Sequence, residues 1–192
     1  SQEWIDRVKK RQPEFREEKL KRYKKEFDIP QYDAEILTES KHMADIFEET
    51  TAICGKPKKV SNWLMVETMR LLKEHGMEPE DISFSPANLA KLIGLTEAGT
   101  INSSVAKEVF EQVFEKDVDP ESYVEEHGLK TVNDEGALEE VLKEVIAKNP
   151  KAIADYKGGK EKALGALVGQ TMKAMKGKAN PGMVNKILKE LL

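Results

Sequence analysis

The sequence contains few of the residues that stabilise small secreted or metal-dependent domains. Its 192 residues include a single cysteine, Cys54, so the chain can form no internal disulfide. The three histidines, His42, His75 and His127, stand far apart and show no spacing typical of metal ligands. No apolar run approaches the roughly 20 residues that a membrane-spanning helix requires, and no signal-peptide pattern opens the chain. These absences exclude a disulfide-bonded scaffold, a zinc module and a helical membrane protein.

Aromatic residues are also scarce, at 6% of the sequence, whereas charged residues make up 34%. An average soluble domain carries about 25% charged residues. Because β-sandwiches draw on aromatic and β-branched residues, this composition favours helices with one polar face. We therefore expect a soluble, cytoplasmic protein of the all-α class.

Signals for the start and end of helices recur along the chain. A short polar side chain at the N-cap accepts a hydrogen bond from a first-turn amide, and proline suits the next position because it has no amide hydrogen. Four capping residues each precede a proline: Ser85, Asp119, Asn149 and Asn180. A glycine followed by an apolar residue is typical of a helix end in the left-handed conformation. Three glycines fit this pattern: Gly76, Gly94 and Gly128.

Between these signals, apolar residues recur at helical spacing, as in Val105, Val109 and Val113. No segment shows the alternation of apolar and polar residues that is typical of a β-strand. The pattern predicts helices at about residues 3–11, 14–27, 33–38, 40–53, 57–75, 86–93, 102–116, 120–127, 134–148, 150–156, 160–176 and 181–191.

The charge of the chain changes sign toward its end. Between Glu108 and Glu140 twelve acidic residues accompany two lysines, whereas from Lys151 onward nine lysines accompany three acidic residues. Near His127–Asn133, a glycine stop at Gly128, a short polar stretch and a new capping signal coincide. We therefore expect two parts: a helical stem domain, residues 1–128, and a tail module of three to four helices, residues 129–192. The basic tail suits a polyanion, although lysines that merely solvate a helix face would give the same pattern.

No enzyme signature is present. Gly158-Gly159-Lys160 lacks the first glycine and the Ser/Thr of a phosphate-binding loop. His42 and Asp45 lie one helical turn apart, but no nucleophile is near them in the sequence. We predict no catalytic residue and no metal site in this chain.

Two glycines, Gly165 and Gly169, stand four residues apart inside a predicted helix. Glycine costs a helix about 1 kcal/mol relative to alanine, so a pair on one face needs a reason. We predict that they allow close packing, with a neighbouring helix favoured over a nucleic acid as the contact.

Three lysines gather beyond this pair, where one predicted helix ends and the next begins. Lys173, Lys176 and Lys178 surround Gly177 just before the capping residue Asn180. Ammonium groups beside the first amides of a helix would form a seat for a phosphate. Ordinary capping of the preceding helix explains Lys173 and Lys176 equally well.

These residues also carry a family resemblance. The run VGQTMKAMKGKANPGMVNKILKELL, from Val168 to the end, resembles the close of the B subunits of bacterial aspartyl/glutamyl-tRNA amidotransferases, the GatB family. It is also similar to the related free-standing YqeY-like proteins. Upstream segments agree, among them Glu3-Trp4-Ile5, Ile29-Pro30-Gln31-Tyr32, Asn62-Trp63 and Gly99-Thr100-Ile101-Asn102. The resemblance covers essentially the whole chain and leaves out the family's catalytic domain. The start at Ser1, without a methionine, agrees with this, and we expect a fragment of a longer polypeptide.

The resemblance implies that the parent protein is part of a ligase of protein biosynthesis. This enzyme converts Glu-tRNA(Gln) or Asp-tRNA(Asn) to the amide, using ATP and ammonia from glutamine. ATP and magnesium would act in the catalytic domain, so this chain is expected to need no cofactor and to be inactive alone. The implied partners are tRNA and two further proteins of the enzyme, the amidase (the A subunit) and the small C subunit, with neither DNA nor a membrane among them.

The resemblance further implies a role in tRNA selection for the tail. Matched to the family's segment, the tRNA contacts at the outer corner of the RNA would be Lys173, Lys176, Gly177, Lys178 and Asn180. Two alternatives remain open: a module that docks the partner amidase, and a free-standing YqeY-like protein. The sequence does not distinguish glutamyl-tRNA from aspartyl-tRNA as the substrate.

Overall fold

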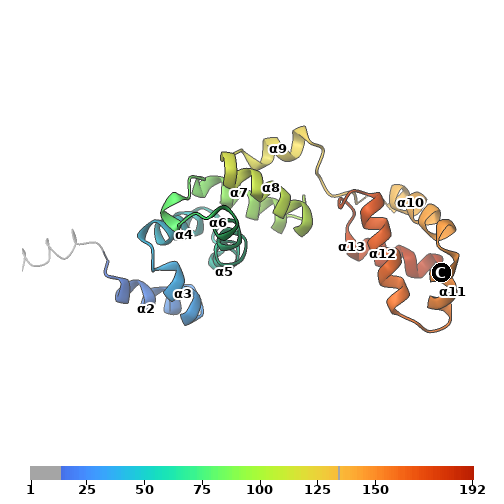
Figure 1. The fold of residues 1–192 in the computed structure, drawn as a ribbon, viewed down its shortest axis with the longest axis horizontal. Coiled ribbons are helices and arrows are strands. Elements are labelled where there is room, and N and C mark those ends of the chain that lie inside the picture. The colour runs from blue at the N-terminus through green and yellow to red at the C-terminus, as the bar shows by residue number, and fades with distance from the viewer. Residues whose placement is uncertain (1–13, 134) are drawn as a thin grey trace, which may run out of the picture. The chain divides into compact units, whose positions relative to one another are not determined.

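The structure, a computed structural model, describes residues 14–133 and 135–192. Helices joined by short turns make up this part of the chain, and no strand forms in it (Figure 1). The predicted all-α class is confirmed, while the predicted helix at 3–11 lies outside the described residues. Across these residues, no helix combines the length and apolar character needed to cross a membrane. The α-helices are α2 (Arg16–Glu26), α3 (Gln31–Leu37), α4 (Lys41–Cys54), α5 (Pro57–Asn62), α6 (Met69–His75), α7 (Pro86–Glu97), α8 (Ser103–Lys116), α9 (Pro120–Glu126), α10 (Glu135–Lys148), α11 (Pro150–Lys157), α12 (Lys162–Ala174) and α13 (Pro181–Leu191).

The chain forms two compact units. The first contains the residues up to Ala90 together with Phe114–Asp117, and the second contains Lys91–Val113 together with Val118–Leu192. The boundary expected after Gly128, between a stem and a tail, stays a prediction.

Most of the predicted helix signals operate as expected. Asp119 and Asn180 accept hydrogen bonds from first-turn amides, at 2.9 Å from Ser122 N and 2.9 Å from Gly182 N. Ser85 does the same for Asn88 N at 3.4 Å. Gly76 and Gly128 adopt the left-handed conformation, with φ of 64° and 56°.

Two of these signals were wrong. Gly94 lies inside α7, and the left-handed glycine that follows this helix is Gly99, with φ of 71°. Ile101, which is buried, donates its amide back to Leu95 O at 3.4 Å, so the fold-back occurs five residues later than predicted. Asn149 makes no capping bond to α11 and instead donates its Nδ2 to Val145 O at 2.8 Å, at the end of α10.

The predicted single helix at 57–75 is continuous but changes its winding. Between α5 and α6, residues Trp63–Thr68 form a π-helical segment, η1. Thr68 Oγ1 donates to Trp63 O at 3.2 Å, five residues earlier. Leu64 and Thr68 of this segment are buried, whereas Val66 is exposed.

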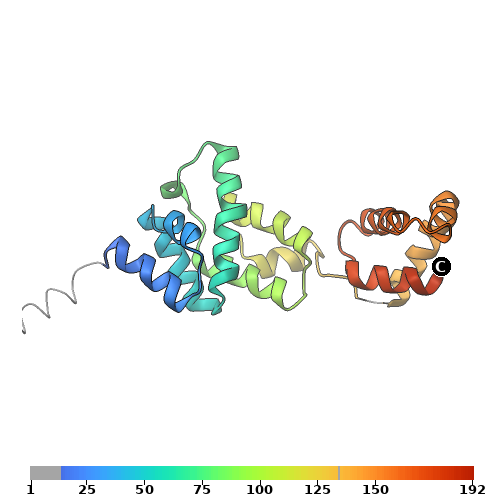
Figure 2. The same ribbon diagram turned by 90° about the horizontal axis from the view of Figure 1, so that it is seen from below.

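In the C-terminal part of the second unit, residues 135–192, three helices contribute most of the buried core residues. Leu138 and Leu142 of α10, Leu167 of α12, and Val184 and Leu188 of α13 are all buried. Helix α10 contacts both α12 and α13, and α11 contacts α12. Figure 2 shows these four helices as one group, in orange to red. Each fully buried leucine or valine stabilises the fold by about 1.5–3 kcal/mol, so the helices on either side of residues 175–180 are held firmly together.

A polar network in the first unit joins α2 to α4. Tyr23 is buried against Phe47, with ring centroids 4.7 Å apart, and its hydroxyl donates to Glu48 Oε1 at 2.7 Å. The same oxygen accepts from Lys19 Nζ and from Arg22 Nη2, each at 2.9 Å. Burial alone would raise the pKa of Glu48, but the hydrogen bonds from Tyr23 and Lys19 and the charges of Lys19 and Arg22 outweigh it. The pKa of Glu48 is therefore held below its ordinary value of 4.5.

We predict that Glu48→Gln destabilises the protein by about 1–2 kcal/mol at pH 7, because the charge-assisted bonds to Lys19 and Arg22 are lost. A carboxyl with a lowered pKa stabilises the fold above its unfolded pKa and stops doing so as pH falls through its folded pKa. The difference in the free energy of unfolding between the variant and the parent chain should therefore become smaller as the pH falls below about 4.5. Urea unfolding followed by circular dichroism measures both effects.

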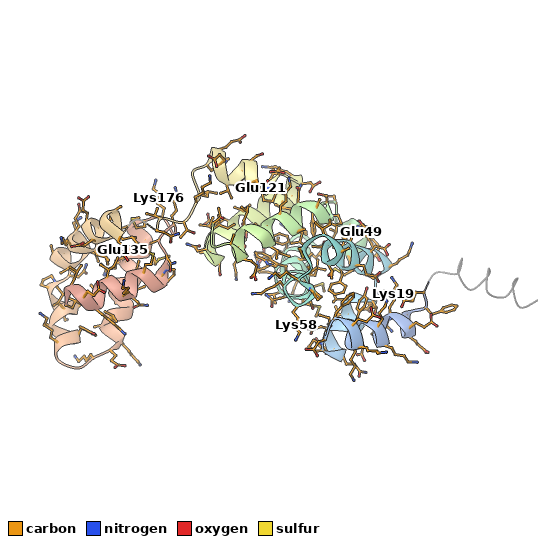
Figure 3. All side chains as sticks on the ribbon, turned by 180° about the vertical axis from the view of Figure 1, so that it is seen from behind. Lys19, Glu49, Lys58, Glu121, Glu135 and Lys176 are labelled. Carbon is orange, nitrogen blue, oxygen red and sulfur yellow. The ribbon has the colours of Figure 1, made fainter. Side chains whose placement is uncertain are left out.

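The matched control is Glu49→Gln, which changes an exposed residue of α4. Figure 3 labels Glu49, and also Lys19 of α2. This variant should unfold like the parent chain. Equal effects of the two substitutions would contradict the role given to Glu48.

Candidate nucleic-acid interface

The predicted lysine site lies where α12 ends and α13 begins. We call residues 175–180 the lysine loop. Lys176 and Gly177 are both in the left-handed region, with φ of 51° and 75°. Gly177 N donates to Met172 O at 2.7 Å and Lys178 N donates to Met175 O at 3.0 Å. The first bond satisfies a carbonyl in the last turn of α12, the second that of its C-cap residue, and together they turn the chain sharply.

Asn180 ends the lysine loop and caps α13. Its Oδ1 accepts from Gly182 N at 2.9 Å and from Met183 N at 3.4 Å, and its carbonyl accepts from Val184 N at 3.0 Å. The first amides of α13 therefore already have acceptors. This corrects the expectation that free amides would help to seat a phosphate, so the attraction for an anion at this place comes from the lysine side chains.

Some lysines of the second unit have a carboxylate partner, and the three lysines of the site have none among the residues that the structure describes. Lys143, Lys148, Lys160 and Lys186, in the same unit, pair with Glu139, Glu144, Asp155 and Glu135 at 2.6, 3.4, 2.9 and 3.5 Å. Within the described part of the chain, Lys173, Lys176 and Lys178 form no ion pair. Lys173 and Lys176 are exposed and Lys178 is partly exposed. Figure 3 shows Lys176 at the turn between the two helices.

The face of α12 that carries Gly165 and Gly169 is open. Both glycines are exposed, and a Cβ added at either position would meet no atom within 4 Å. The neighbouring helix predicted to pack on them is not found among the described residues. The physical reason is that Leu167 and Thr171, on the other side of α12, form the buried face. Packing against a second molecule stays a prediction. Lys173, one turn beyond Gly169, shares the open face.

Sequence reasoning missed one residue of this site, Asn102. Its Oδ1 caps α8 by accepting from Ser104 N at 3.1 Å and Val105 N at 3.0 Å. Its Nδ2 donates to the carbonyls of Gly177 and Ala179 in the lysine loop, the second at 3.3 Å. The capping signal was visible just before Ser103. The second role joins residues more than 70 positions apart, which no local pattern reveals.

An open cavity of about 300 Å³ lies beside this contact, lined by Asn102, Ser104, Thr131, Met172 and Asn180 among others. No group of three or more histidine, cysteine or acidic side chains capable of holding a metal occurs in residues 14–133 and 135–192. The exposed ammonium groups can attract an anionic chain to this surface.

The fold and the site together define an all-α domain with a lysine-bearing turn between two capped helices. Residues 45–192 match the family model described as the GatB domain, and the chain belongs to this family. The family resemblance expected from the sequence is confirmed.

The chain is similar to several proteins named as the B subunit of aspartyl/glutamyl-tRNA(Asn/Gln) amidotransferase. It is 69% identical to the one from Agathobacter rectalis over the whole chain and 40% of that relative. It is 60% identical to the one from Lachnospira eligens, over the whole chain and 41% of the relative. It is 57% identical to the one from Lachnoclostridium phytofermentans, again over 40% of the relative. The chain thus spans about two fifths of the length of these relatives and corresponds to their C-terminal part.

The open surroundings of Gly169 give a direct prediction. Gly169→Ala should stabilise the chain by about 1 kcal/mol, because alanine lowers the conformational entropy of the unfolded state and its methyl group meets no neighbour. Chemical unfolding of the two proteins at low concentration measures the difference. Gly177→Ala is the contrasting variant, since its φ of 75° strains any L side chain, and it should destabilise. A loss of stability in Gly169→Ala would contradict the open face described above.

Proposed function

We propose that this chain is the tRNA-binding, non-catalytic part of an amidotransferase B subunit. The observation that carries the proposal is the set of three lysines at one helix turn with no carboxylate partner among the described residues. The names of the relatives, which state an activity on aspartyl- and glutamyl-tRNA, support it. In this account the contacts to RNA are Lys173, Lys176, Gly177, Lys178 and Asn180.

The physical basis is recognition of the RNA backbone. Phosphate contacts by lysine supply affinity and register, and a folded RNA is read largely by its shape and its 2′-hydroxyl and phosphate groups. A rigid turn that holds several ammonium groups suits the outer corner of a tRNA, where the backbone bends. Partial exposure of Gly177 lets a backbone approach the loop closely.

In this proposal, the reaction of the parent enzyme takes place outside this chain. We propose that a larger B subunit, acting in the cytoplasm in translation, converts Glu-tRNA(Gln) or Asp-tRNA(Asn) to the amide. ATP and magnesium would act in its catalytic domain, while this chain selects the tRNA. The amidase would supply ammonia, and the small C subunit would complete the assembly.

Docking of the partner amidase is a second candidate function, and one observation favours it. The first unit exposes large apolar side chains that a protein partner would cover: Phe15 is 64%, Tyr32 70%, Ile53 60% and Val66 51% exposed. These residues lie in a different unit from the lysines. Both functions can therefore belong to one chain, and substitutions at either set of residues separate them.

We predict that reversing two charges, Lys176→Glu with Lys178→Glu, weakens binding of a glutamine tRNA transcript about tenfold or more at physiological salt. Each phosphate contact releases condensed counterions from the RNA when it forms. Losing two contacts should therefore reduce the magnitude of the slope of log K against log salt by about 2. Fluorescence anisotropy titrations at several salt concentrations measure both quantities.

The matched control is Lys151→Glu with Lys157→Glu on α11, which changes the net charge of the same unit equally. It should bind within about threefold of the parent chain. Equal weakening by both double variants would mean that net charge alone attracts the RNA. No weakening by the variant of the lysine loop would refute the proposed interface.

A further inference from the structure

Asn102 connects two elements of the second unit through opposite ends of its side chain. The amide oxygen caps α8, as described above, and the amide nitrogen donates to two carbonyls of the lysine loop. The side chain is only partly exposed, and its two bonds to the lysine loop are partly buried. Both ends have protein partners, which fixes the orientation of the side chain.

The contact extends over three successive carbonyls of the lysine loop. Those of Gly177 and Ala179 accept from Asn102, and the carbonyl between them, of Lys178, accepts from Val132 N at 2.8 Å. Val132 and Ala179 form an isolated parallel bridge, and Ala179 is fully buried. The backbone of the loop is thus held by the residue that caps α8 on one side and by the segment before α10 on the other.

These hydrogen bonds to the lysine loop are important because its backbone conformation is uncommon. A lysine with positive φ persists only where its surroundings fix it, and Lys176 at 51° is such a residue. The carbonyl oxygens of the loop carry partial negative charge, which would repel a phosphate beside the ammonium groups. Donors within the chain compensate that charge at residues 177–179.

We propose that Asn102 is a positioning residue for RNA binding: it holds the lysine loop in the form that presents Lys176 and Lys178 together to the RNA backbone. The inference rests on the proposed function of the loop. Asn102 itself contacts no RNA in this account and acts through the loop carbonyls. Asparagine is suited to the task because one end accepts two amides and the other donates to two carbonyls. Serine or aspartate can cap the helix but cannot supply the two donated bonds.

The test is a double-mutant cycle on the full 192-residue chain with the glutamine tRNA transcript as probe. The first variant is Asn102→Ser, which keeps a capping oxygen for α8 and removes the donors to the loop. The second is Lys176→Ala with Lys178→Ala, and the third combines all three changes. Titrations at low salt keep every affinity measurable. Asn185→Ser, at an exposed asparagine of α13 in the same unit, is the matched control.

We expect Asn102→Ser to weaken binding about threefold to tenfold in the parent chain and by less than about twofold once the two lysines are gone. Such non-additivity is the signature of a residue that acts through them. The melting temperature should stay close to that of Asn185→Ser, because the cap of α8 is retained.

Other results separate the two proposals. If the lysine variant binds weakly and Asn102→Ser binds fully, the role of Asn102 is refuted and the lysine interface stands. If Asn102→Ser weakens binding equally in both backgrounds, it acts independently of the lysines and the inference is refuted. If the lysine variant binds as tightly as the parent chain, the proposed function fails and the positioning role fails with it.

Discussion

The hydrogen bonds that fix the turn between α12 and α13 determine where the charges of the last helices can act. Helix α12 ends through bonds from Gly177 N and Lys178 N, and α13 begins on the side chain of Asn180. Between them, Asn102 and Val132 occupy the carbonyls of residues 177–179. The backbone of the turn has few polar groups left for a ligand, so recognition falls to the lysine side chains that the turn supports.

The two units use their basic residues in different ways. In the first, Lys19 and Arg22 are partly buried and share Glu48, so their charge is neutralised within the fold and joins α2 to α4. In the second, the apolar contacts of Leu138, Leu142 and Leu167 already hold the helices together. Several lysines there form ion pairs, whereas Lys173, Lys176 and Lys178 have no carboxylate partner among the described residues. This separation explains how an acidic chain, with a net charge of −4, offers a local electropositive surface.

The local parts of this structure could be predicted from the sequence. The helix starts at Pro120 and Pro181 follow from capping residues and proline, because these signals act within one turn. The prediction at Gly94 was wrong because glycine costs a helix only about 1 kcal/mol, which the buried Leu92 and Ile93 outweigh. The prediction at Asn149 was wrong because a side chain with both a donor and an acceptor can serve either of the two helices that it joins.

The candidate site could be predicted only in part. A cluster of lysines around a glycine and an asparagine is visible in one short segment, and so is the cap at Asn180. Gly165 and Gly169 did not reveal which face of α12 is buried, because small residues suit either a close contact or an open surface. The bond from Asn102 to Gly177 depends on how distant segments meet, and the intervening residues carry no signal for it.

The most direct test of the lysine interface is the chemical reactivity of each lysine with and without RNA. Brief acetylation of the chain, followed by mass spectrometry, reports every ammonium group in one experiment. In the presence of the glutamine tRNA transcript, Lys173, Lys176 and Lys178 should become protected, while Lys151 and Lys157 of α11 should react as before. Unchanged reactivity of the three lysines at the turn, or equal protection of all five, would contradict the account.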